Sequence, residues 1–429
     1  MEAEGFTAWF NGGCVRDRLL GKEPKDYDIA TNAKPEEVEK LFPRANLIGA
    51  HFGVVLVKEP EGHFEIATFR TDHEYEDGRR PTKVTFATPE DDAQRRDFTV
   101  NGLFENPETG EVIDYVNGRA DLDQQLLRAI GDPERRFAED RLRMLRAIRF
   151  ATTLGFQIDP ETFAAIQTHA SAIHEISVER IRDELVRTLL HPNRVRGFDL
   201  LVESGLMKGI LPEILVLQGC EQPPQFHPEG DVFVHTRLML SLLKGDDASL
   251  PLVLSVLFHD IAKPATYTYD EENERIRFNG HDRLGAEMTE VILRRLKFSN
   301  EVIEAAVEMV SRHMQFMNVK LMRTAKLKRF MSTERFTDEM ELHRVDCMSS
   351  NGMLDNYDFV QEKREEFANE PLIPARLVTG RDLLEMGWKP GPEIGRVLET
   401  VQTEQLEGRL TERQAALEWV RTNVAIKVD

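Results

Sequence analysis

The sequence predicts an α+β protein in which a small head with a mixed β-sheet precedes an elongated, all-helical body. Up to about residue 125, short runs of β-forming residues such as FGVVLV and FEIATF alternate with helix signals and turn pairs. From about residue 126 onward, apolar residues recur at spacings of three and four, which is typical of amphipathic helices. The head is therefore expected to contain strands as well as helices, and the body is expected to contain mainly helices.

Four segments follow from this division. The head covers residues 1–125 and a helical neck covers residues 126–220. The Pro-rich stretch EQPPQFHPEGD, residues 221–231, predicts a boundary, after which a third segment extends over 221–350. A helical tail covers residues 351–429. A chain of 429 residues is long enough for several domains of ordinary size.

Several elements of the body have clear start and stop signals. The stretch from Asp132 to Gly155 is predicted as one helix, because Asp-Pro is a typical start and glycine a typical stop. A second capped helix is expected to begin at Ser177. The stretch TYTYDEENERIRF predicts a β-hairpin, and KPGP predicts a turn before an amphipathic helix of the tail.

Composition excludes several classes of protein. No apolar run approaches the ~18 residues needed to cross a bilayer, so no membrane partner is expected. Three widely separated cysteines predict no disulfide framework and favour a cytoplasmic location. A net charge of −20 argues against non-specific nucleic-acid binding by the whole surface. Two basic stretches, 141–149 and 320–329, are candidate RNA contacts or simply solvated helix faces.

The first chemical motif combines a glycine pair, residues 12–13, with two closely spaced aspartates. Glycines allow backbone amides to approach phosphate oxygens, and Arg16 could add a charge-assisted bond. Asp26 and Asp28 would lie on one face of an extended strand, where paired carboxylates favour a divalent cation such as Mg²⁺. Glu65 could supply a third carboxylate. The pattern predicts two-metal phosphoryl transfer, although Asp-X-Asp also occurs by chance in acidic proteins.

Motifs over nearly the whole chain resemble those of the polymerase-β-like nucleotidyltransferases. They are GGCVRDRLLG, PKDYDIAT, IGAHFGVVLV, RRDFTVNG, IDYVNGRADL, RAIGDPERRFAEDRLRMLRAIRFA and ISVERIRDEL, in the family's order and spacing. Within that group the chain is similar to the bacterial class II tRNA nucleotidyltransferases, the CCA-adding enzymes, and to their poly(A) polymerase relatives. The resemblance implies that Asp26 and Asp28 bind the metal ions. It also implies that Gly13, Arg16 and Arg96 contact the nucleoside triphosphate.

Selection of the nucleobase needs a second motif. Cytosine and adenine share an exocyclic amine beside a ring-nitrogen acceptor, so one carboxylate and one guanidinium could select them. Asp140 and Arg143, three residues apart on the predicted helix, have a suitable spacing. The resemblance implies this role and places Arg146 and Arg149 along the nucleotide site. The alternative is an exposed helix ion pair worth ~0.3–0.5 kcal/mol.

The resemblance implies transfer of CMP and then AMP, from CTP and ATP, to the 3′ end of tRNA. The stretch LIGAHFGVVLV, with His51, Phe52 and Gly53, lacks the arginine-rich signature of poly(A) polymerases and favours a tRNA enzyme. Residues 70–84 contain the complete polar loop, with Arg79, Arg80 and Pro81, that enzymes adding only CC lack in part. Addition of the final A alone stays an alternative. The neck and the tail are expected to bind tRNA, and no signal sets an oligomeric state.

Six residues of the third segment form a second candidate metal site. They are His235, His259, Asp260, His281, His313 and Asp346. Their order resembles the HD phosphohydrolase superfamily, which implies one or two divalent ions, such as Ni, Mn, Co or Fe, that activate water. Hydrolysis of a phosphomonoester or a 2′,3′-cyclic phosphate is then a second activity or, as an alternative, the main one. Other readings are a relic scaffold that positions tRNA, and an RNA-binding protein whose head is inactive.

Overall fold

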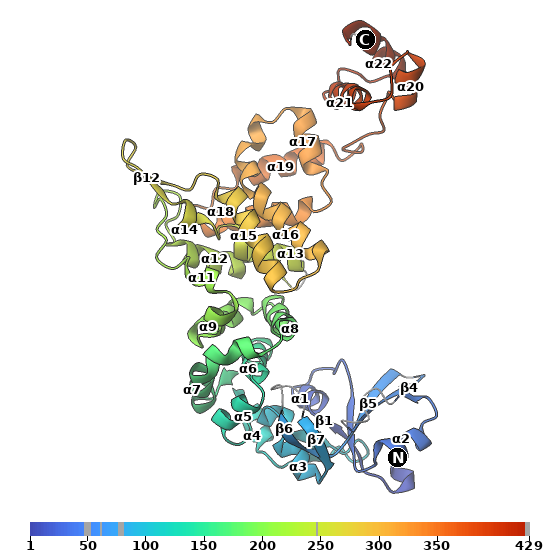
Figure 1. The fold of residues 1–429 in the computed structure, drawn as a ribbon, viewed down its shortest axis with the longest axis vertical. Helices are drawn as coiled ribbons and strands as arrows, with labels where there is room; N and C mark the ends of the chain where they lie inside the picture. Colours follow the sequence, from blue (N-terminus) through green and yellow to red (C-terminus); the bar gives the residue numbers. More distant parts are fainter. Residues whose placement is uncertain (47–52, 61, 76–80, 246–247, 425–429) are drawn as a thin grey trace. The chain divides into compact units, whose positions relative to one another are not determined.

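The protein consists of two compact units (Figure 1). The computed structural model describes residues 1–46, 53–60, 62–75, 81–245 and 248–424. The first unit is Met1–Val216 with Ile292–Phe298, and the second is Leu217–Val291 with Ser299–Asp429. Among the described residues, no helix is long and apolar enough to cross a membrane.

A seven-stranded mixed sheet forms the head, in the order β3-β4-β5-β2-β1-β8-β9. Its strands are β1 Ala8–Asn11, β2 Asp28–Thr31, β3 Ala45–Asn46, β4 Val54–Glu59, β5 Gly62–Thr68, β8 Leu103–Glu105 and β9 Val112–Asp114. β2 and β5 are parallel, and the other neighbouring pairs are antiparallel. The residues VVLV of the first β-rich run lie in β4 and most of FEIATF lies in β5, which confirms the predicted mixed sheet.

Helices α1 to α4 belong to the head, and helices α5 to α11 follow it, as predicted. They are α1 Gly13–Leu19, α2 Pro35–Leu41, α3 Pro89–Gln94, α4 Gly118–Asp123, α5 Pro133–Glu139, α6 Leu142–Leu154, α7 Pro160–His169, α8 Val178–Leu189, α9 Arg194–Glu203, α10 Leu206–Ile210 and α11 Pro212–Leu215. A short parallel pair, β10 Leu126–Leu127 and β11 Gln157–Ile158, lies among them. Val38 of α2 packs with Val55 and Ile66 of the sheet in one apolar cluster of the head.

The predicted helix from Asp132 to Gly155 is two helices. Its ends are as expected: the Asp132 side chain accepts from the backbone N–H of Glu134, and Gly155 ends α6 with φ of +76°. Between α5 and α6, Asp140 has an extended backbone, with φ −142° and ψ 104°. Ser177 occupies the predicted N-cap position of α8, although its side chain makes no capping hydrogen bond.

The stretch 70–84, predicted as a loop, contains two antiparallel strands, β6 Arg70–Tyr75 and β7 Pro81–Phe86. Its tip, with Arg79 and Arg80, lies outside the described residues, as do His51 and Phe52. Alternating β-formers on both sides of the tip make a paired ribbon more favourable than an open loop.

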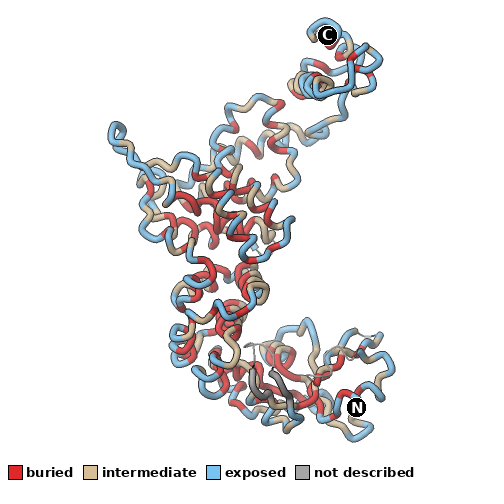
Figure 2. Tube along the Cα trace, in the orientation of Figure 1, coloured by how far each residue is buried: buried red, intermediate tan, exposed pale blue. Residues whose placement is uncertain are grey.

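The second unit is helical apart from one hairpin. Its helices are α12 Val232–Leu242, α13 Leu250–Phe258, α14 Lys263–Thr266, α15 His281–Arg295, α16 Asn300–Arg312, α17 Thr324–Met331, α18 Phe336–Ser349, α19 Asp355–Glu366, α20 Gly380–Glu385, α21 Pro392–Leu406 and α22 Arg413–Asn423. α15 begins in this unit, and its last residues belong to the first. The predicted hairpin is confirmed as β12 Thr268–Asp270 and β13 Arg275–Arg277. Figure 2 shows buried residues concentrated in the helices around α12, α13 and α16.

Candidate active site and a second polar cluster

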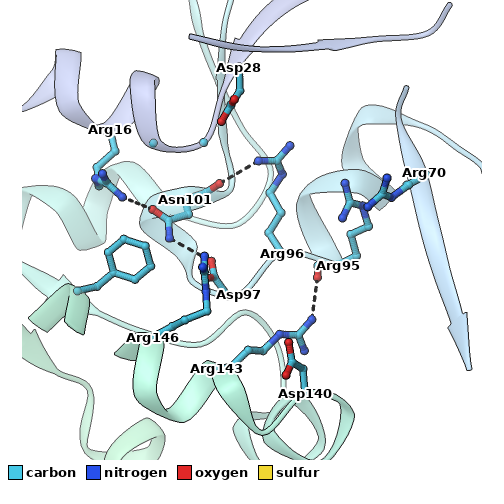
Figure 3. A pocket seen from close by; sticks show the side chains of 13 residues that line it. Arg16, Asp28, Arg70, Arg95, Arg96, Asp97, Asn101, Asp140, Arg143 and Arg146 are labelled. Carbon is cyan, nitrogen blue, oxygen red and sulfur yellow. Dashed lines mark hydrogen bonds and ion pairs between the residues drawn. The ribbon is translucent and has the colours of Figure 1, made fainter. Parts of the chain in front are cut away.

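A polar pocket of about 470 Å³ lies in the first unit (Figure 3). It is lined by Gly12, Gly13, Arg16, Asp28, Arg70, Arg95, Arg96, Asp97, Asn101, Asp140, Arg143, Arg146 and Phe150. Six of these side chains are arginines and three are aspartates, so the pocket is cationic in a protein of net charge −20. A pocket of this charge favours a polyanionic ligand.

The glycine turn brings the backbone close to an arginine of the pocket. Gly12 has φ of +69°, and α1 begins at Gly13. A Cβ atom at Gly12 would lie only 3.0 Å from Nη1 of Arg96. Any other residue there would be strained and would press on this guanidinium group. The turn therefore leaves open space in front of Arg96 and Arg16, both of which line the pocket.

Three carboxylates gather where β2 begins. Asp28 is the first residue of β2 and is paired in register with Glu65 of the parallel strand β5. Burial, then the negative charge of Glu65, raise the pKa of Asp28; Arg96 opposes this shift and Asp26 adds to it. Carboxylates this close repel one another, and such groups are the usual ligands of hard divalent cations. The donor set therefore fits a metal ion.

One expectation about this group is wrong. Asp26 does not lie in the same strand as Asp28 but in the bend that precedes it, where it is exposed. Backbone pairing with β5 begins only at Asp28, so the alternation of an extended strand does not apply to Asp26. Of the three acids, Asp28 alone lines the pocket.

A chain of hydrogen bonds crosses the pocket (Figure 3). Arg16 Nη1 donates to Asn101 Oδ1 at 2.6 Å, and Asn101 Nδ2 donates to Asp97 Oδ1 at 3.0 Å. On its other side, Asp97 Oδ2 lies 2.6 Å from Arg146 Nη2. Burial raises the pKa of Asp97, but Arg146 and Asn101 outweigh it and lower the pKa to about 2. The ionised carboxylate therefore fixes Arg146.

Sequence reasoning missed Asp97 and Asn101, although both lie in the motif RRDFTVNG. Only Arg96 of this motif was assigned a role, which the family resemblance implied. The spacing of residues within the motif does not indicate that Asn101 contacts Arg16 of α1 or that Asp97 contacts Arg146 of α6. Arg96 is itself held by Asp92 of α3, at 2.8 Å between Nη2 and Oδ2.

Asp140 lines the pocket but does not share a helix with Arg143. It lies at the break between α5 and α6, where its Oδ1 accepts from the backbone N–H of Leu142 at 3.0 Å. Its Oδ2 accepts from Arg180 Nη2 of α8 at 3.2 Å. The prediction that both residues lie three apart on one helix is therefore wrong, because α5 ends before Asp140.

Arg143 is buried and is held by other partners. Its Nη1 donates to the carboxylate of Glu139 and to the backbone carbonyl of Arg136, each at 3.0 Å. Its Nη2 donates to the backbone carbonyl of Arg95 at 3.3 Å. The exposed ion pair with Asp140, considered above as an alternative, is not formed. Both residues instead reach the pocket from fixed positions.

The two remaining arginines of α6 differ in position. Arg146 lines the pocket, whereas Arg149 does not. Arg149 Nε lies 2.5 Å from Glu184 Oε2 of α8, and its guanidinium group covers the ring of Phe150 at 3.9 Å from the centroid. Arg149 therefore supports the wall of the pocket through Phe150.

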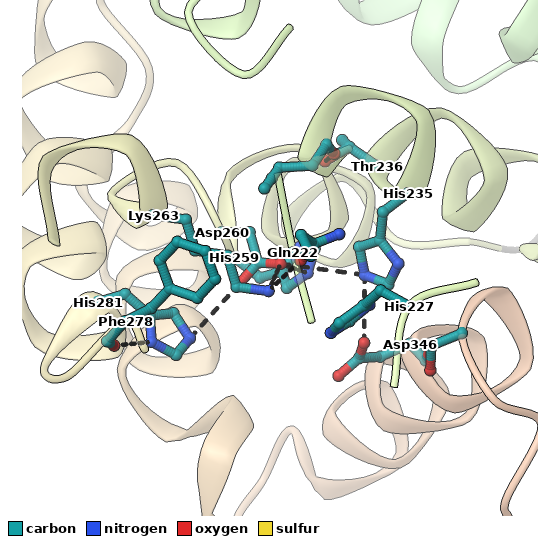
Figure 4. A network of polar contacts seen from close by, with 12 residues as sticks. Gln222, His227, His235, Thr236, His259, Asp260, Lys263, Phe278, His281 and Asp346 are labelled. Carbon is teal, nitrogen blue, oxygen red and sulfur yellow. Dashed lines mark hydrogen bonds and ion pairs between the residues drawn. The ribbon is translucent and has the colours of Figure 1, made fainter. Parts of the chain in front are cut away.

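The six residues predicted as a second metal site lie together in the second unit. Figure 4 shows His235, His259, Asp260, His281 and Asp346. They form two groups of three ligand atoms, in each of which the atoms lie within 4.8 Å of one another. These are His235, His259 and Asp346 in one group, and Asp260, His281 and His313 in the other. Asp260 joins the groups, since its Oδ2 lies 3.0 Å from His259 Nε2 and its Oδ1 lies 3.4 Å from His281 Nε2.

Two buried ring nitrogens of the cluster, Nε2 of His235 and Nε2 of His259, have no hydrogen-bond partner within the described ranges. Nε2 of His235 lies 3.2 Å from Asp346 Oδ1, and Nε2 of His259 lies 3.0 Å from Asp260 Oδ2. Neither contact counts as a hydrogen bond. Leaving such a group unpaired costs about 1–3 kcal/mol. A divalent cation between the nitrogens and the carboxylates would remove this cost, so the residues fit a metal ion.

Lys263, which sequence reasoning did not single out, also contacts the cluster. Its Nζ lies 2.7 Å from Asp260 Oδ2 and donates to Gln222 Oε1 at 2.6 Å. Burial raises the pKa of Asp260, but His259 and Lys263 outweigh it and hold the pKa well below its usual value. The spacing of three residues between Asp260 and Lys263 could have indicated this contact, since it corresponds to about one helical turn.

A pocket of about 680 Å³ opens next to the cluster. Its walls include four members of the cluster: Asp260, His281, His313 and Asp346. Four cationic side chains also line it: Lys263, Arg275, Arg277 and Lys320. The hairpin of β12 and β13 supplies two of these cations. Anionic ligands could thus approach the cluster.

Three family models match successive parts of the chain. "Poly A polymerase head domain" matches residues 8–128, "Probable RNA and SrmB- binding site of polymerase A" matches 155–217, and "tRNA nucleotidyltransferase domain 2" matches 282–420. Together they cover the sheet, the helices α7 to α11 and most of the second unit, whereas residues 129–154, with α5 and α6, lie between two matches.

Similar proteins extend over nearly the full length. The CCA-adding enzyme of Levilactobacillus brevis is 34% identical over 420 residues, which are 97% of this chain and 94% of the relative. The CCA-adding enzyme of Lactococcus lactis subsp. cremoris is 34% identical, over 97% of this chain and 92% of the relative. The structure of the Bacillus stearothermophilus CCA-adding enzyme in complex with CTP matches with a TM-score of 0.72 and 26% identity, over 98% of this chain and 95% of that one. The chain belongs to the family of CCA-adding enzymes.

Proposed function

We propose that this protein adds CMP and then AMP, from CTP and ATP, to the 3′ end of tRNA. In each step the terminal 3′-oxygen of the RNA bonds to the α-phosphorus, the bond from this phosphorus to the bridging oxygen of the β-phosphate breaks, and the hydroxyl proton is lost. Pyrophosphate leaves. The observation that carries the proposal is one pocket in which Asp28, the glycine turn and six arginines converge.

Asp26 and Asp28 would hold Mg²⁺ at the edge of this pocket, with help from Glu65. The mutual repulsion that contributes to the raised pKa of Asp28 favours a cation at this position. When bound, Mg²⁺ promotes loss of the hydroxyl proton and neutralises charge on the leaving pyrophosphate. In this proposal Gly13, Arg16 and Arg96 bind the triphosphate.

Asp140 and Arg143 would read the base edge, the first by accepting from the exocyclic amine and the second by donating to the ring nitrogen. Both are held by protein partners, which favours selection by a rigid template. Arg146 would contact the nucleotide directly, whereas Arg149 would act by supporting Phe150.

We also propose the four-segment division given above, with base selection in residues 126–220, the histidine-containing segment in 221–350 and tRNA binding by the tail, 351–429. The division between the two units after Val216 lies a few residues before the second boundary. A cytoplasmic location accords with three free cysteines and with substrates of the translation machinery.

The deciding experiment supplies tRNAs ending before CCA, after C and after CC, each with one nucleoside triphosphate at a time. We expect CTP to extend the first two and ATP to extend the third, with no use of UTP or GTP. Extension of the third substrate alone would indicate an A-adding enzyme. Repeated use of ATP on any RNA would indicate a poly(A) polymerase, and no extension at all would refute the proposal.

A second candidate function is metal-dependent phosphohydrolysis at the cluster of the second unit. It is supported by the unpartnered Nε2 atoms of His235 and His259, and by the four cations of the adjoining pocket. The six cluster residues would hold one or two divalent ions such as Mn, Co, Ni or Fe. These ions would activate water for attack on a phosphomonoester or a 2′,3′-cyclic phosphate.

Replacing each cluster residue with alanine tests this function separately from nucleotide addition. We expect phosphatase activity to fall in every variant, while CMP and AMP incorporation stays near normal. A wild-type protein without phosphatase activity in the presence of these metals would leave the cluster with a structural role only.

A further inference from the structure

Glu229, which is not one of the six predicted ligands, contacts the ring of His235. His235 is fully buried, and its Nδ1 lies 2.7 Å from Oε1 of Glu229. The opposite ring nitrogen, Nε2, faces the carboxylates of Asp346 at 3.2 Å and Asp260 at 3.9 Å. The ring therefore lies between one carboxylate outside the cluster and two inside it.

This placement decides which nitrogen of His235 is free for a metal. A carboxylate beside Nδ1 favours a proton on that nitrogen, so the lone pair of the neutral ring is on Nε2 and points into the cluster. Ser349 Oγ lies 3.3 Å from the same Nδ1 and supports the same orientation. Carboxylates in this position also make the imidazole a stronger metal ligand.

Glu229 belongs to the Pro-rich stretch 221–231, which contacts the cluster directly at one end and through Lys263 at the other. At one end, Gln222 accepts from Lys263, which contacts Asp260. At the other, Glu229 Oε1 lies next to His235 and also 2.9 Å from Nδ1 of His227. The stretch that the sequence predicts as a domain boundary is thus connected to the proposed metal ligands through Glu229 and through Gln222 with Lys263.

We propose that Glu229 is a positioning residue that orients His235 for metal binding, so that the metal affinity of the cluster depends on residues 221–231. The inference rests on the metal site proposed above. In this proposal Glu229 would not contact the metal, because its Oε1 lies next to Nδ1 of His235 and the metal would bind Nε2. Its removal should weaken binding by about 10-fold to 100-fold, the usual effect of losing such a partner.

The test is a titration of the metal-free full-length protein with Co²⁺, followed by calorimetry and by visible absorption. Glu229→Gln keeps the shape but removes the charge, and we expect weaker affinity and an altered Co²⁺ spectrum. Glu229→Asp should partly restore the Co²⁺ affinity and the Co²⁺ spectrum of the unaltered protein. Glu221→Gln, at an exposed position of the same stretch, is the matched control and should behave as the unaltered protein.

Two outcomes would overturn the inference in distinguishable ways. If the unaltered protein binds no Co²⁺, the metal site and this inference fail together. If it binds Co²⁺ and Glu229→Gln binds equally well with the same spectrum, this inference fails alone. Should Glu229→Gln not fold, hydrogen exchange of residues 221–231 in the unaltered protein decides: Co²⁺ should slow it, and unchanged exchange would refute the coupling.

Discussion

The pocket of the head and the cluster of the second unit balance their charges in different ways. In the pocket, arginines already have partners, as when Asp97 holds Arg146 at 2.6 Å. In the cluster, the buried Nε2 atoms of His235 and His259 have no hydrogen-bond partner in the part of the chain that the structure describes. The pocket is therefore organised before its ligand arrives, whereas the cation proposed for the cluster would complete it.

This difference has a functional meaning. A fixed polar wall can select a base edge at little reorganisation cost, because its donors and acceptors do not have to move. A cluster of imidazoles and carboxylates instead gains stability when a metal enters, so metal binding and folding are coupled. Variants in the two regions should accordingly affect different measurements.

The largest effect is expected from Asp28→Ala, which should change nucleotide incorporation at the head and leave the cluster of the second unit unaffected. Loss of a metal ligand should lower the rate of CMP incorporation by about 1000-fold or more, since several kcal/mol of transition-state stabilisation are removed. Co²⁺ binding by the cluster should not change. Asp123→Ala, at an exposed position of the head, is the control. Near-normal incorporation by Asp28→Ala would contradict the assignment.

Metal addition should stabilise the second unit. At ~100 times its dissociation constant, Mn²⁺ should raise the free energy of unfolding by about 2.7 kcal/mol. Asp260→Asn should abolish this gain, because Asp260 joins both groups of ligands. Urea unfolding with and without Mn²⁺ measures it, with the exposed Asp358→Asn as control. An equal gain in Asp260→Asn would show that the metal binds elsewhere.

Acid should weaken the head through Asp97. Its pKa is about 2 in the folded protein, below the usual 3.8, so its contribution is complete above pH 3.8 and is lost as the pH falls toward 2. The contribution is about 2 kcal/mol. Asp97→Asn should therefore lower the free energy of unfolding near neutral pH and flatten its fall in acid. Identical pH profiles for this variant and for Asp123→Asn would refute the role of the Arg146 pair.

The smallest effect is expected for base choice. Asp140→Asn should reduce the preference for CTP over UTP by about tenfold, equivalent to ~1.4 kcal/mol, because the amide can also donate to a carbonyl. The ratio of kcat/KM for the two nucleotides measures it. Asp183→Asn, an exposed residue of α8, should leave the ratio unchanged. If Asp140→Asn also left it unchanged, base selection would have to come from other groups.

Much of the fold could be predicted because the signals are local. The runs FGVVLV and FEIATF form adjacent strands, and Asp132 and Gly155 delimit the helical stretch between them. The six residues of the cluster were also identified from the sequence, since histidines and aspartates in this order resemble a known pattern. Each of these predictions depends on residue type and spacing alone.

Two of the errors concern partners that are distant in the sequence. Asp140 was placed on a helix with Arg143, but it leaves the helix and binds Arg180, 40 residues away. Asp97 received no role, yet it pairs with Arg146, 49 residues away. Neither pairing leaves a periodic signal.

By itself the sequence determined most strands and helices, which residue types are available for phosphate and metal chemistry, and the family to which the chain belongs. It did not show the break at Asp140 or the strands β6 and β7. Only the tertiary structure decided which carboxylate holds which arginine, and that Glu229 lies behind His235. The physical reason is the distance along the chain over which each interaction acts. Backbone conformation follows mainly from neighbouring residues, whereas a buried charge is stabilised by whichever groups the fold brings within a few ångströms of it.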